Sequence, residues 1–247
     1  MAAPRMRIGL LGGSFDPPHA AHRQISATAL KRLGLDRVWW LVTPGNPLKP
    51  SSKADLESRV EAARKAARHS RVEVTGFSAG SAYTIDLLAA LKRRFPGVNF
   101  VWLMGADNLA EFHRWRAWEK IFALMPIAVL DRPGFRLRAR AGKAAQRFAP
   151  YMVDESDAGG LPLLIPPAWT ILTHRLSPLS STSIRAKKAK QKKGKKAKAG
   201  GKQTNVAKKG KTRANGKRTK GKTAKGSAKG ESRSKARKQV KRKAKRH

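Results

Sequence analysis

Residues 7–22 read RIGLLGGSFDPPHAAH, and this stretch decides the fold. Its first part, residues 7–11, is a short apolar run of the kind that forms a buried strand. Glycines and prolines dominate residues 12–18 and predict a loop. Apolar side chains then recur at helical spacing until Gly34, a good helix stop. A strand, a glycine-rich loop and a helix in this order are typical of α/β proteins that bind a ligand at the carboxyl end of a strand.

The remainder of residues 1–185 repeats the alternation of strand and helix. Helical composition covers residues 55–69, 83–95 and an aromatic-rich stretch that ends at 124. Further strands are predicted at residues 38–42, 71–75, 99–104, 127–130 and 168–173, while residues 136–162 are less regular. Buried strands that alternate with helices predict an α/β fold: a Rossmann-like, doubly wound parallel sheet in a single domain.

The loop after the first strand has the composition of an anion site. Its glycines allow backbone amides to approach a phosphate closely, and the helix start adds the positive end of a dipole. His19 and His22 are three residues apart, so they share one helix face and can both donate hydrogen bonds to phosphate oxygens. Zinc would also suit this spacing, but no third ligand is evident, so we predict no protein metal site. The plain alternative is a pair of exposed histidines.

A second anion site is predicted at residues 179–185, LSSTSIR. Hydroxyls and free amides at a helix start, followed one turn later by an arginine, can hold phosphate oxygens. The residues that would do so are Ser181, Thr182 and Arg185. The alternative is an ordinary helix cap that leads into the basic residues after it.

Composition excludes several classes of protein. The 247 residues include no cysteine, which excludes a disulfide framework, a thiolate zinc site and a cysteine nucleophile. The longest apolar runs are far shorter than the ~20 residues that span a bilayer. The apolar segment near the N-terminus is also too short for a secretory signal. We therefore expect a cytoplasmic protein with no membrane partner.

Residues 186–247 have a different character from residues 1–185. Of these 62 residues, 28 are Lys or Arg and one, Glu231, is acidic, so the net charge is +27. With no aromatic side chain and only two valines, this tail cannot bury enough apolar surface to offset the entropy of ordering, and we expect disorder. Its charge predicts possible nonspecific, salt-sensitive binding of nucleic acid. A solubility extension is the alternative.

Two of these segments carry a family resemblance. Residues 12–22, GGSFDPPHAAH, are similar to the G-G-[ST]-F-D-P-x-H-x-G-H signature of the nucleotidylyltransferase superfamily, with Ala21 in place of the usual glycine. Residues 179–185 resemble its second signature, I-S-S-T-x-I-R. The resemblance implies that His19 and His22 stabilise the transferring phosphate. It also implies ATP-binding roles for Gly12, Gly13, Ser14, Phe15, Ser181, Thr182 and Arg185.

Three other stretches resemble bacterial nicotinate-mononucleotide adenylyltransferases. They are TPGNPLK at 43–49, with Leu48 where histidine is frequent, AYTIDLL at 82–88 and FVWLMGADNLAEFHRW at 100–115. Residues 131–134, DRPG, partly match a further family turn. The resemblance implies a catalytic Lys49, an Asp107 that binds the ATP ribose, and a mononucleotide site made by Tyr83, Thr84 and Trp115. Without it, these residues would be a solvated loop lysine, helix caps and a core aromatic.

The resemblance as a whole implies transfer of AMP from ATP to nicotinate mononucleotide, which gives nicotinate adenine dinucleotide and pyrophosphate. Mg²⁺ would accompany ATP without a tight protein site. Two alternatives stay open: an adenylyl- or cytidylyltransferase with another acceptor, such as nicotinamide mononucleotide or phosphopantetheine, and a nucleic-acid-binding protein that uses the α/β part as a scaffold. The oligomeric state is unknown at this stage.

Overall fold

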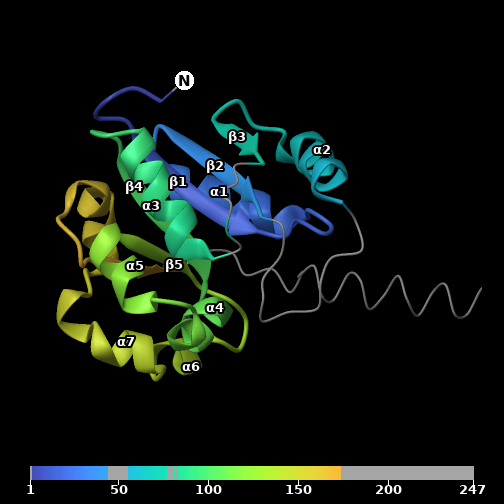
Figure 1. The fold of residues 1–247 in the computed structure, drawn as a ribbon. Helices are drawn as coiled ribbons and strands as arrows, with labels where there is room; N and C mark the ends of the chain where they lie inside the picture. The colour runs from blue at the N-terminus through green and yellow to red at the C-terminus, as the bar shows by residue number, and fades with distance from the viewer. Residues whose placement is uncertain (1, 44–54, 77–80, 82, 174–247) are drawn as a thin grey trace, which may run out of the picture. The chain divides into compact units, whose positions relative to one another are not determined.

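The computed structural model describes residues 2–43, 55–76, 81 and 83–173. At its centre lies a six-stranded parallel sheet in the order β3-β2-β1-β4-β5-β6 (Figure 1). The strands are β1 (Arg7–Gly13), β2 (Arg37–Val42), β3 (Val72–Thr75), β4 (Asn99–Gly105), β5 (Ile127–Leu130) and β6 (Trp169–Leu172). This is the order of a doubly wound Rossmann-type sheet, so the predicted fold class is confirmed.

Helices cover both faces of the sheet. One face carries α1 (Ala20–Arg32), α2 (Leu56–Ala67) and the 3₁₀ segment η3 (Glu155–Leu163). The other carries α3 (Thr84–Arg94), α4 (Ala106–Glu111), η1 (Phe112–Arg114), α5 (Trp118–Leu124), α6 (Arg136–Arg140) and α7 (Lys143–Arg147). The short η2 (Ala149–Tyr151) follows α7. Figure 1 shows α2 beside the β3 end of the sheet and α5 to α7 toward the opposite end.

The central strand β1 is buried on both faces. Ile8 and Leu10 belong to the core under α3 and α5, and Leu11 belongs to the core under α1 and α2. This division follows from the sequence, because successive side chains of a strand point to opposite faces. On the neighbouring β2, the buried Trp40 indole donates a hydrogen bond from Nε1 to Ser26 Oγ at 2.7 Å. The bond fixes α1, which begins at the histidine pair, against the sheet.

The first strand is longer than predicted. Gly12 and Gly13, expected in the loop, are the last two residues of β1 and lie opposite Leu41 and Val42 of β2. A Cβ atom at Gly12 would collide with the indole ring of Trp102 on β4. Glycine at this position is therefore required by the packing of the neighbouring strand, a reason that the sequence pattern did not reveal.

The aromatic-rich stretch that ends at 124 has the expected helical character, but it is not one helix. The chain instead forms α4, η1 and α5, with extended backbone at Trp115 and a left-handed φ of 51° at Ala117. These two residues turn the chain between the short helices. The less regular segment at 136–162 forms α6, α7, η2 and most of η3.

The predicted boundary between residues 185 and 186 lies outside the described residues and stays a prediction. Within the part of the chain that the structure describes, none of the helices has both the length and the apolar character needed to cross a bilayer.

Candidate active site

The sheet order creates a switch point between β1 and β4. These strands are neighbours, with Leu11 opposite Leu103, but the chain proceeds from β1 toward β2 and β3 on one side and from β4 toward β5 and β6 on the other. Open α/β sheets bind their ligands in the crevice outside the carboxyl ends of the strands at such a point. Here those ends lead into Ser14 and Phe15 after β1 and into Asp107 after β4.

The two histidines meet at the start of α1. His19 is the N-cap residue and His22 lies in the first turn, and their rings stack with centroids 3.9 Å apart. The backbone N–H of His19 donates to Nδ1 of His22 at 3.2 Å. Because Nδ1 accepts this bond, the proton of a neutral His22 resides on Nε2, which is then a hydrogen-bond donor. The prediction that the two imidazoles share one face is confirmed.

Both imidazoles are neutral at physiological pH. Burial is the main cause that lowers the pKa of His22 to about 3, with smaller contributions from His19 and from the charge of Arg132. Burial, followed by Arg132, lowers the pKa of His19 to about 4. Nδ1 of His19 is buried and has no hydrogen-bond partner among the described residues. The pair therefore offers neutral polar groups to a ligand, and the positive charge nearby comes from Arg132.

Phe15 locks the loop against the core. Its backbone has a left-handed φ of 47°, which is uncommon for a bulky residue and persists only when the surroundings impose it. The ring is 1% exposed and lies 5.0 Å from the Trp40 ring and 4.6 Å from the His22 ring. A continuous line of ring contacts thus runs from Trp40 in β2 through Phe15 to the histidine pair, and it holds the imidazoles in a fixed orientation.

Asp107 lies at the carboxyl end of β4, inside the first turn of α4. Its Oδ2 is 2.5 Å from Nη1 of Arg132, which follows β5. The N-cap of α4 is Gly105, so the alternative interpretation of Asp107 as the cap is wrong. A Cβ at Gly105 would collide with the Asp107 carboxylate, so the glycine leaves room for the carboxylate at the strand end.

Arg132 is a site residue that the sequence analysis did not select. It pairs with Asp107, and its charge lowers the pKa of both His19 and His22, so it lies within electrostatic reach of both imidazoles. The available signal was its position two residues after the last residue of β5, Leu130, at the same sheet edge as Asp107. The DRPG turn at 131–134 is only a partial match to the family turn, and nothing in the sequence connects residue 132 to residue 19.

Tyr83 and Thr84 mark the start of α3, as predicted. Tyr83 is the N-cap and makes no side-chain capping bond, so the alternative that Thr84 caps this helix is wrong. The Arg116 guanidinium carbon lies 4.5 Å from the centre of the Tyr83 ring. This contact joins the α3 start to the turn that carries Trp115.

The two tryptophans beside that turn, Trp115 and Trp118, pack differently. Trp115 is partly buried, and its ring centre lies 5.0 Å from that of Phe112. Trp118 packs edge-on against Phe122 and Phe148 at the core. Trp115 thus keeps some exposed surface at the same turn as Arg116.

The structure brings only part of the predicted site together. Gly12 to Phe15, the histidine pair and Asp107 all lie at the carboxyl edge of the sheet around the switch point. Lys49, Ser181, Thr182 and Arg185 lie outside the described residues, so the predicted meeting of residues 12–22 with residues 180–185 is not tested. Among the described residues there is no group of three His, Cys, Asp or Glu side chains that could hold a metal ion.

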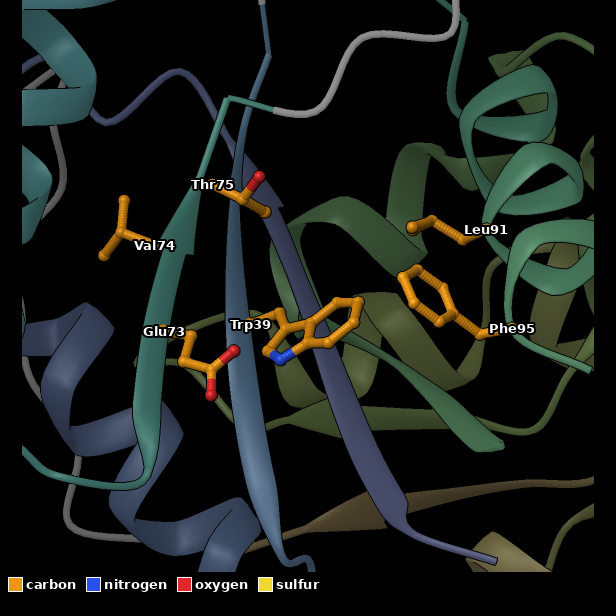
Figure 2. Close-up of a pocket in the computed structure, with 6 residues that line it drawn as sticks. All are labelled: Trp39, Glu73, Val74, Thr75, Leu91 and Phe95. Atoms are coloured by element: carbon orange, nitrogen blue, oxygen red, sulfur yellow. The ribbon is translucent and has the colours of Figure 1, made fainter. Parts of the chain in front are cut away.

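A separate pocket of about 230 Å³ lies between the edge strand β3 and the second half of α3 (Figure 2). It is lined by Trp39, Glu73, Val74, Thr75, Leu91 and Phe95. Figure 2 shows the Trp39 and Phe95 rings on the side of the sheet that faces α3. None of the predicted site residues lines this pocket, so it is distinct from the switch point.

The described fold and edge geometry define a nucleotide-binding protein of the parallel α/β class. The chain belongs to the cytidylyltransferase-like family, whose sequence model matches residues 10–187. The match includes both signature segments and ends close to the start of the basic tail.

Several proteins within this family are similar to the chain in sequence or in structure. A "Probable nicotinate-nucleotide adenylyltransferase" of Cereibacter sphaeroides is 55% identical over 183 residues, which are 73% of this chain and 97% of the relative. A protein of the same description from Methylorubrum extorquens is 55% identical over 185 residues, 74% of this chain and 100% of the relative. A solved Plasmodium falciparum nicotinic acid mononucleotide adenylyltransferase complexed with NaAD is 20% identical, with a TM-score of 0.56, over 74% of this chain and 83% of that chain. At that identity, the structural likeness supports the fold.

Proposed function

We propose that this protein transfers the adenylyl group of ATP to nicotinate mononucleotide, forming nicotinate adenine dinucleotide and pyrophosphate. The observation that carries the proposal is the stacked, neutral histidine pair at the start of α1, directly after the glycine-rich end of β1. The relatives at 55% identity, whose printed descriptions name a nicotinate-nucleotide adenylyltransferase, support the choice of acceptor. The proposal places the protein in NAD biosynthesis.

The reaction requires positioning more than covalent catalysis. A phosphate oxygen of the mononucleotide attacks the α-phosphorus of ATP in line, the bond from that phosphorus to the β-phosphate oxygen breaks, and pyrophosphate leaves with the electron pair. No protein nucleophile takes part. The rate then depends on alignment of the two phosphates and on donors that face the developing charge. His19 and His22 suit this task, because a neutral imidazole keeps one N–H group that can donate a hydrogen bond to a phosphate oxygen.

The other predicted residues take the remaining parts of the two substrates. Asp107 accepts hydroxyls of the ATP ribose, and Arg132 holds its carboxylate in place. Tyr83 and Thr84, at the start of α3, take the nicotinate carboxylate, since a helix start offers N–H donors to an anion. The N–H of Tyr83 itself donates to Ser81 Oγ at 3.2 Å. Trp115 offers a ring to the pyridine. We retain Lys49 for the transferring phosphate, and Ser181, Thr182 and Arg185 for the β- and γ-phosphates.

Mg²⁺ fits this site only as a companion of ATP. The ion prefers oxygen ligands and keeps several waters, so phosphate oxygens and water can supply most of its coordination. Two described carboxylates at the strand ends are already paired, Asp107 with Arg132 and Asp131 with Arg136. When bound, the ion would neutralise charge on the ATP phosphates. We retain the cytoplasm as the predicted location.

The basic tail favours a second, independent activity. Its +27 charge over residues 186–247 would release counterions from DNA or RNA, which gives binding without sequence preference and with steep salt dependence. A gel-shift titration at two salt concentrations, full length against residues 1–185, tests this activity. Equal retardation by both proteins would contradict it.

The direct test of the main proposal is pyrophosphate release from ATP and Mg²⁺ with each acceptor in parallel. We expect nicotinate mononucleotide to be used with a higher kcat/KM than nicotinamide mononucleotide, with phosphopantetheine as a further comparison. Preference for the amide or for phosphopantetheine would assign the protein to the alternative acceptor class. No release with any acceptor, from protein that binds ATP, would remove the enzymatic assignment.

A further inference from the structure

Arg59 is a buried arginine that neither the sequence analysis nor the proposed mechanism uses. It lies on α2 and is 3% exposed. Its Nη1 donates to two backbone carbonyls, Ser14 O at 2.8 Å and Thr43 O at 2.7 Å. Its Nε donates to Asp55 O at the start of its own helix, at 3.3 Å. One side chain therefore joins the residue after β1 to the residue after β2.

The two carbonyls lie where the sheet ends. Thr43 N–H still donates to Gly13 O at 3.0 Å, in the manner of a sheet hydrogen bond. One residue further on, the β1 chain enters the loop of the candidate site, and the Arg59 guanidinium bridges the chains instead. A guanidinium offers several donors in one rigid plane, which suits this task better than the single ammonium of a lysine.

A buried cation needs compensation, and the loop provides it. Burial lowers the pKa of Arg59, while the negative charges of Asp16 and Asp55 oppose that effect. Asp16 belongs to the same loop as Ser14. The loop thus stabilises the charge of Arg59 through Asp16, and Arg59 in turn fixes the loop backbone through its bond to Ser14 O.

The bond to Ser14 also orients the next amide group. In a trans peptide the C=O and the following N–H point in opposite directions, and the Ser14–Phe15 peptide is trans. Because Arg59 holds the Ser14 carbonyl, the Phe15 N–H points away from α2. Phe15 then continues with its left-handed φ into the stack that supports His22.

We propose that Arg59 is a positioning residue for the phosphate-binding loop: it sets the Ser14–Phe15 peptide so that the loop presents its amide to a phosphate of ATP, and through Phe15 it sets the histidine pair. This inference rests on the proposed function for the identity of the phosphate. It assigns a role in the reaction to a helix that carries none of the predicted site residues.

The test compares Arg59→Ala and Arg59→Lys with the wild type and with a matched control, Arg32→Ala. Arg32 also donates to a backbone carbonyl, Glu155 O, and pairs with the Glu155 carboxylate at 3.0 Å, but it ends α1 at the opposite end from the histidines. The readouts are Tm, the Kd for ATP by calorimetry without acceptor, and the separate kcat and KM values. All assays run below the lowest Tm.

For Arg59→Ala we expect kcat/KM for ATP to fall about 100-fold, the size of effect that a displacement of about 1 Å in a reacting group produces. The KM for the acceptor stays within about twofold. Added guanidinium chloride at millimolar concentration restores part of the activity. Arg59→Lys, which keeps the charge, loses at least about 10-fold. The control Arg32→Ala has a lower Tm but keeps kcat and both KM values within about twofold. Guanidinium chloride does not change the activity of this control.

A merely structural Arg59 would give a lower Tm with kcat and KM unchanged in the folded protein, and this result overturns the proposal. If Arg59→Ala does not fold, Arg59→Lys decides, and wild-type kcat/KM for ATP in that variant also overturns it. The calorimetric measurement separates the two proposals. Wild-type protein that binds ATP without releasing pyrophosphate would refute the function, while a weaker Kd for ATP in the Arg59 variants would still support the positioning role.

Discussion

The candidate site has two ends: the phosphate end, around Phe15 and the histidine pair, and the ring end, around Tyr83 and Trp115. The phosphate end is packed more tightly than the ring end. At the phosphate end, Trp40, Phe15 and the histidine pair form one line of ring contacts, and Arg59 holds the loop backbone at Ser14. At the ring end, the exposed fraction of Tyr83 is 39%, and an arginine lies over its ring. On the proposed function, this comparison predicts a division of work: a preorganised part would align the phosphates for the chemical step, and a more open part would select the acceptor.

Loss of a donor at the phosphate end should have the largest effect. In His22→Ala we expect kcat to fall about 10²–10³-fold, since this is the usual cost of one donor that faces developing charge. Stopped-flow detection of pyrophosphate measures it. The matched control is His69→Ala, because His69 is exposed and its ring accepts a bond from the nearby Arg71 N–H. Wild-type turnover in His22→Ala would remove the assigned role.

The pH dependence of stability tests the burial of the same pair. The lowered pKa values, about 4 and about 3 against 6.5 unfolded, mean that the unfolded chain binds more protons below pH 6.5. The free energy of unfolding should therefore fall as pH falls from 6.5 toward 4, by up to about 1.4 kcal/mol per pH unit for each imidazole. Above pH 6.5 this contribution is constant. Urea titrations at pH 7.5, 6 and 5 measure it.

The comparison protein for the pH experiment is His19→Asn/His22→Asn. It should show a shallower loss of stability between pH 6.5 and 5 than the wild type. The same pKa values predict that titration of these imidazoles contributes no change in kcat between pH 8 and 5. An identical slope in both proteins would mean that the histidines are solvated and charged in the folded state.

A methyl group at Gly105 should weaken ATP binding with a smaller effect on turnover. In Gly105→Ala the new Cβ displaces the Asp107 carboxylate, so we expect the KM for ATP to rise about 10-fold, equivalent to about 1.4 kcal/mol. Steady-state kinetics with each substrate varied in turn measure it. Gly160→Ala serves as the control, because no atom lies within 4 Å of the Cβ position there. An unchanged KM for ATP would separate Asp107 from the nucleotide.

The smallest effect is expected at the ring end. In Arg116→Ala the contact over Tyr83 is lost, which at an exposed site is worth about 0.5–1 kcal/mol. We expect the KM for nicotinate mononucleotide to rise about 2- to 5-fold while the KM for ATP is unchanged. Lys120→Ala, at an exposed position on α5, is the control. A change confined to ATP would contradict the assignment of the two ends.

Sequence patterns predicted the fold well because its signals are local. The run at residues 127–130 and the helix start at Tyr83 depend on periodicity and on backbone preferences a few residues away. The aromatic-rich stretch before 124 is divided into α4, η1 and α5 by tertiary packing: Phe112 and Phe122 must both reach the same core, and the chain turns at Ala117 to allow this. Local helical composition could not predict that turn.

In the candidate site, too, relations between residues close in the sequence could be predicted, and relations between residues far apart in the sequence could not. The spacing of His19 and His22 was sufficient to predict that they meet. Arg132 was not selected, because 110 residues separate it from the histidines and the relation depends on how β5 stacks beside β4. Arg59 was missed because its partners are backbone carbonyls, which leave no trace in side-chain patterns.

By itself, the sequence determined that strands alternate with helices in a parallel sheet, that a glycine-rich turn precedes a histidine pair, and that the positive charge is concentrated after residue 185. These properties follow from covalent order, side-chain period and composition. Only the tertiary structure decided that both imidazoles are neutral, that Asp107 is paired with Arg132, and that Arg59 joins the ends of β1 and β2. The physical reason is that desolvation and hydrogen-bond geometry depend on which segments fold against a group and exclude water from it. The linear sequence does not show which distant segments come together in this way.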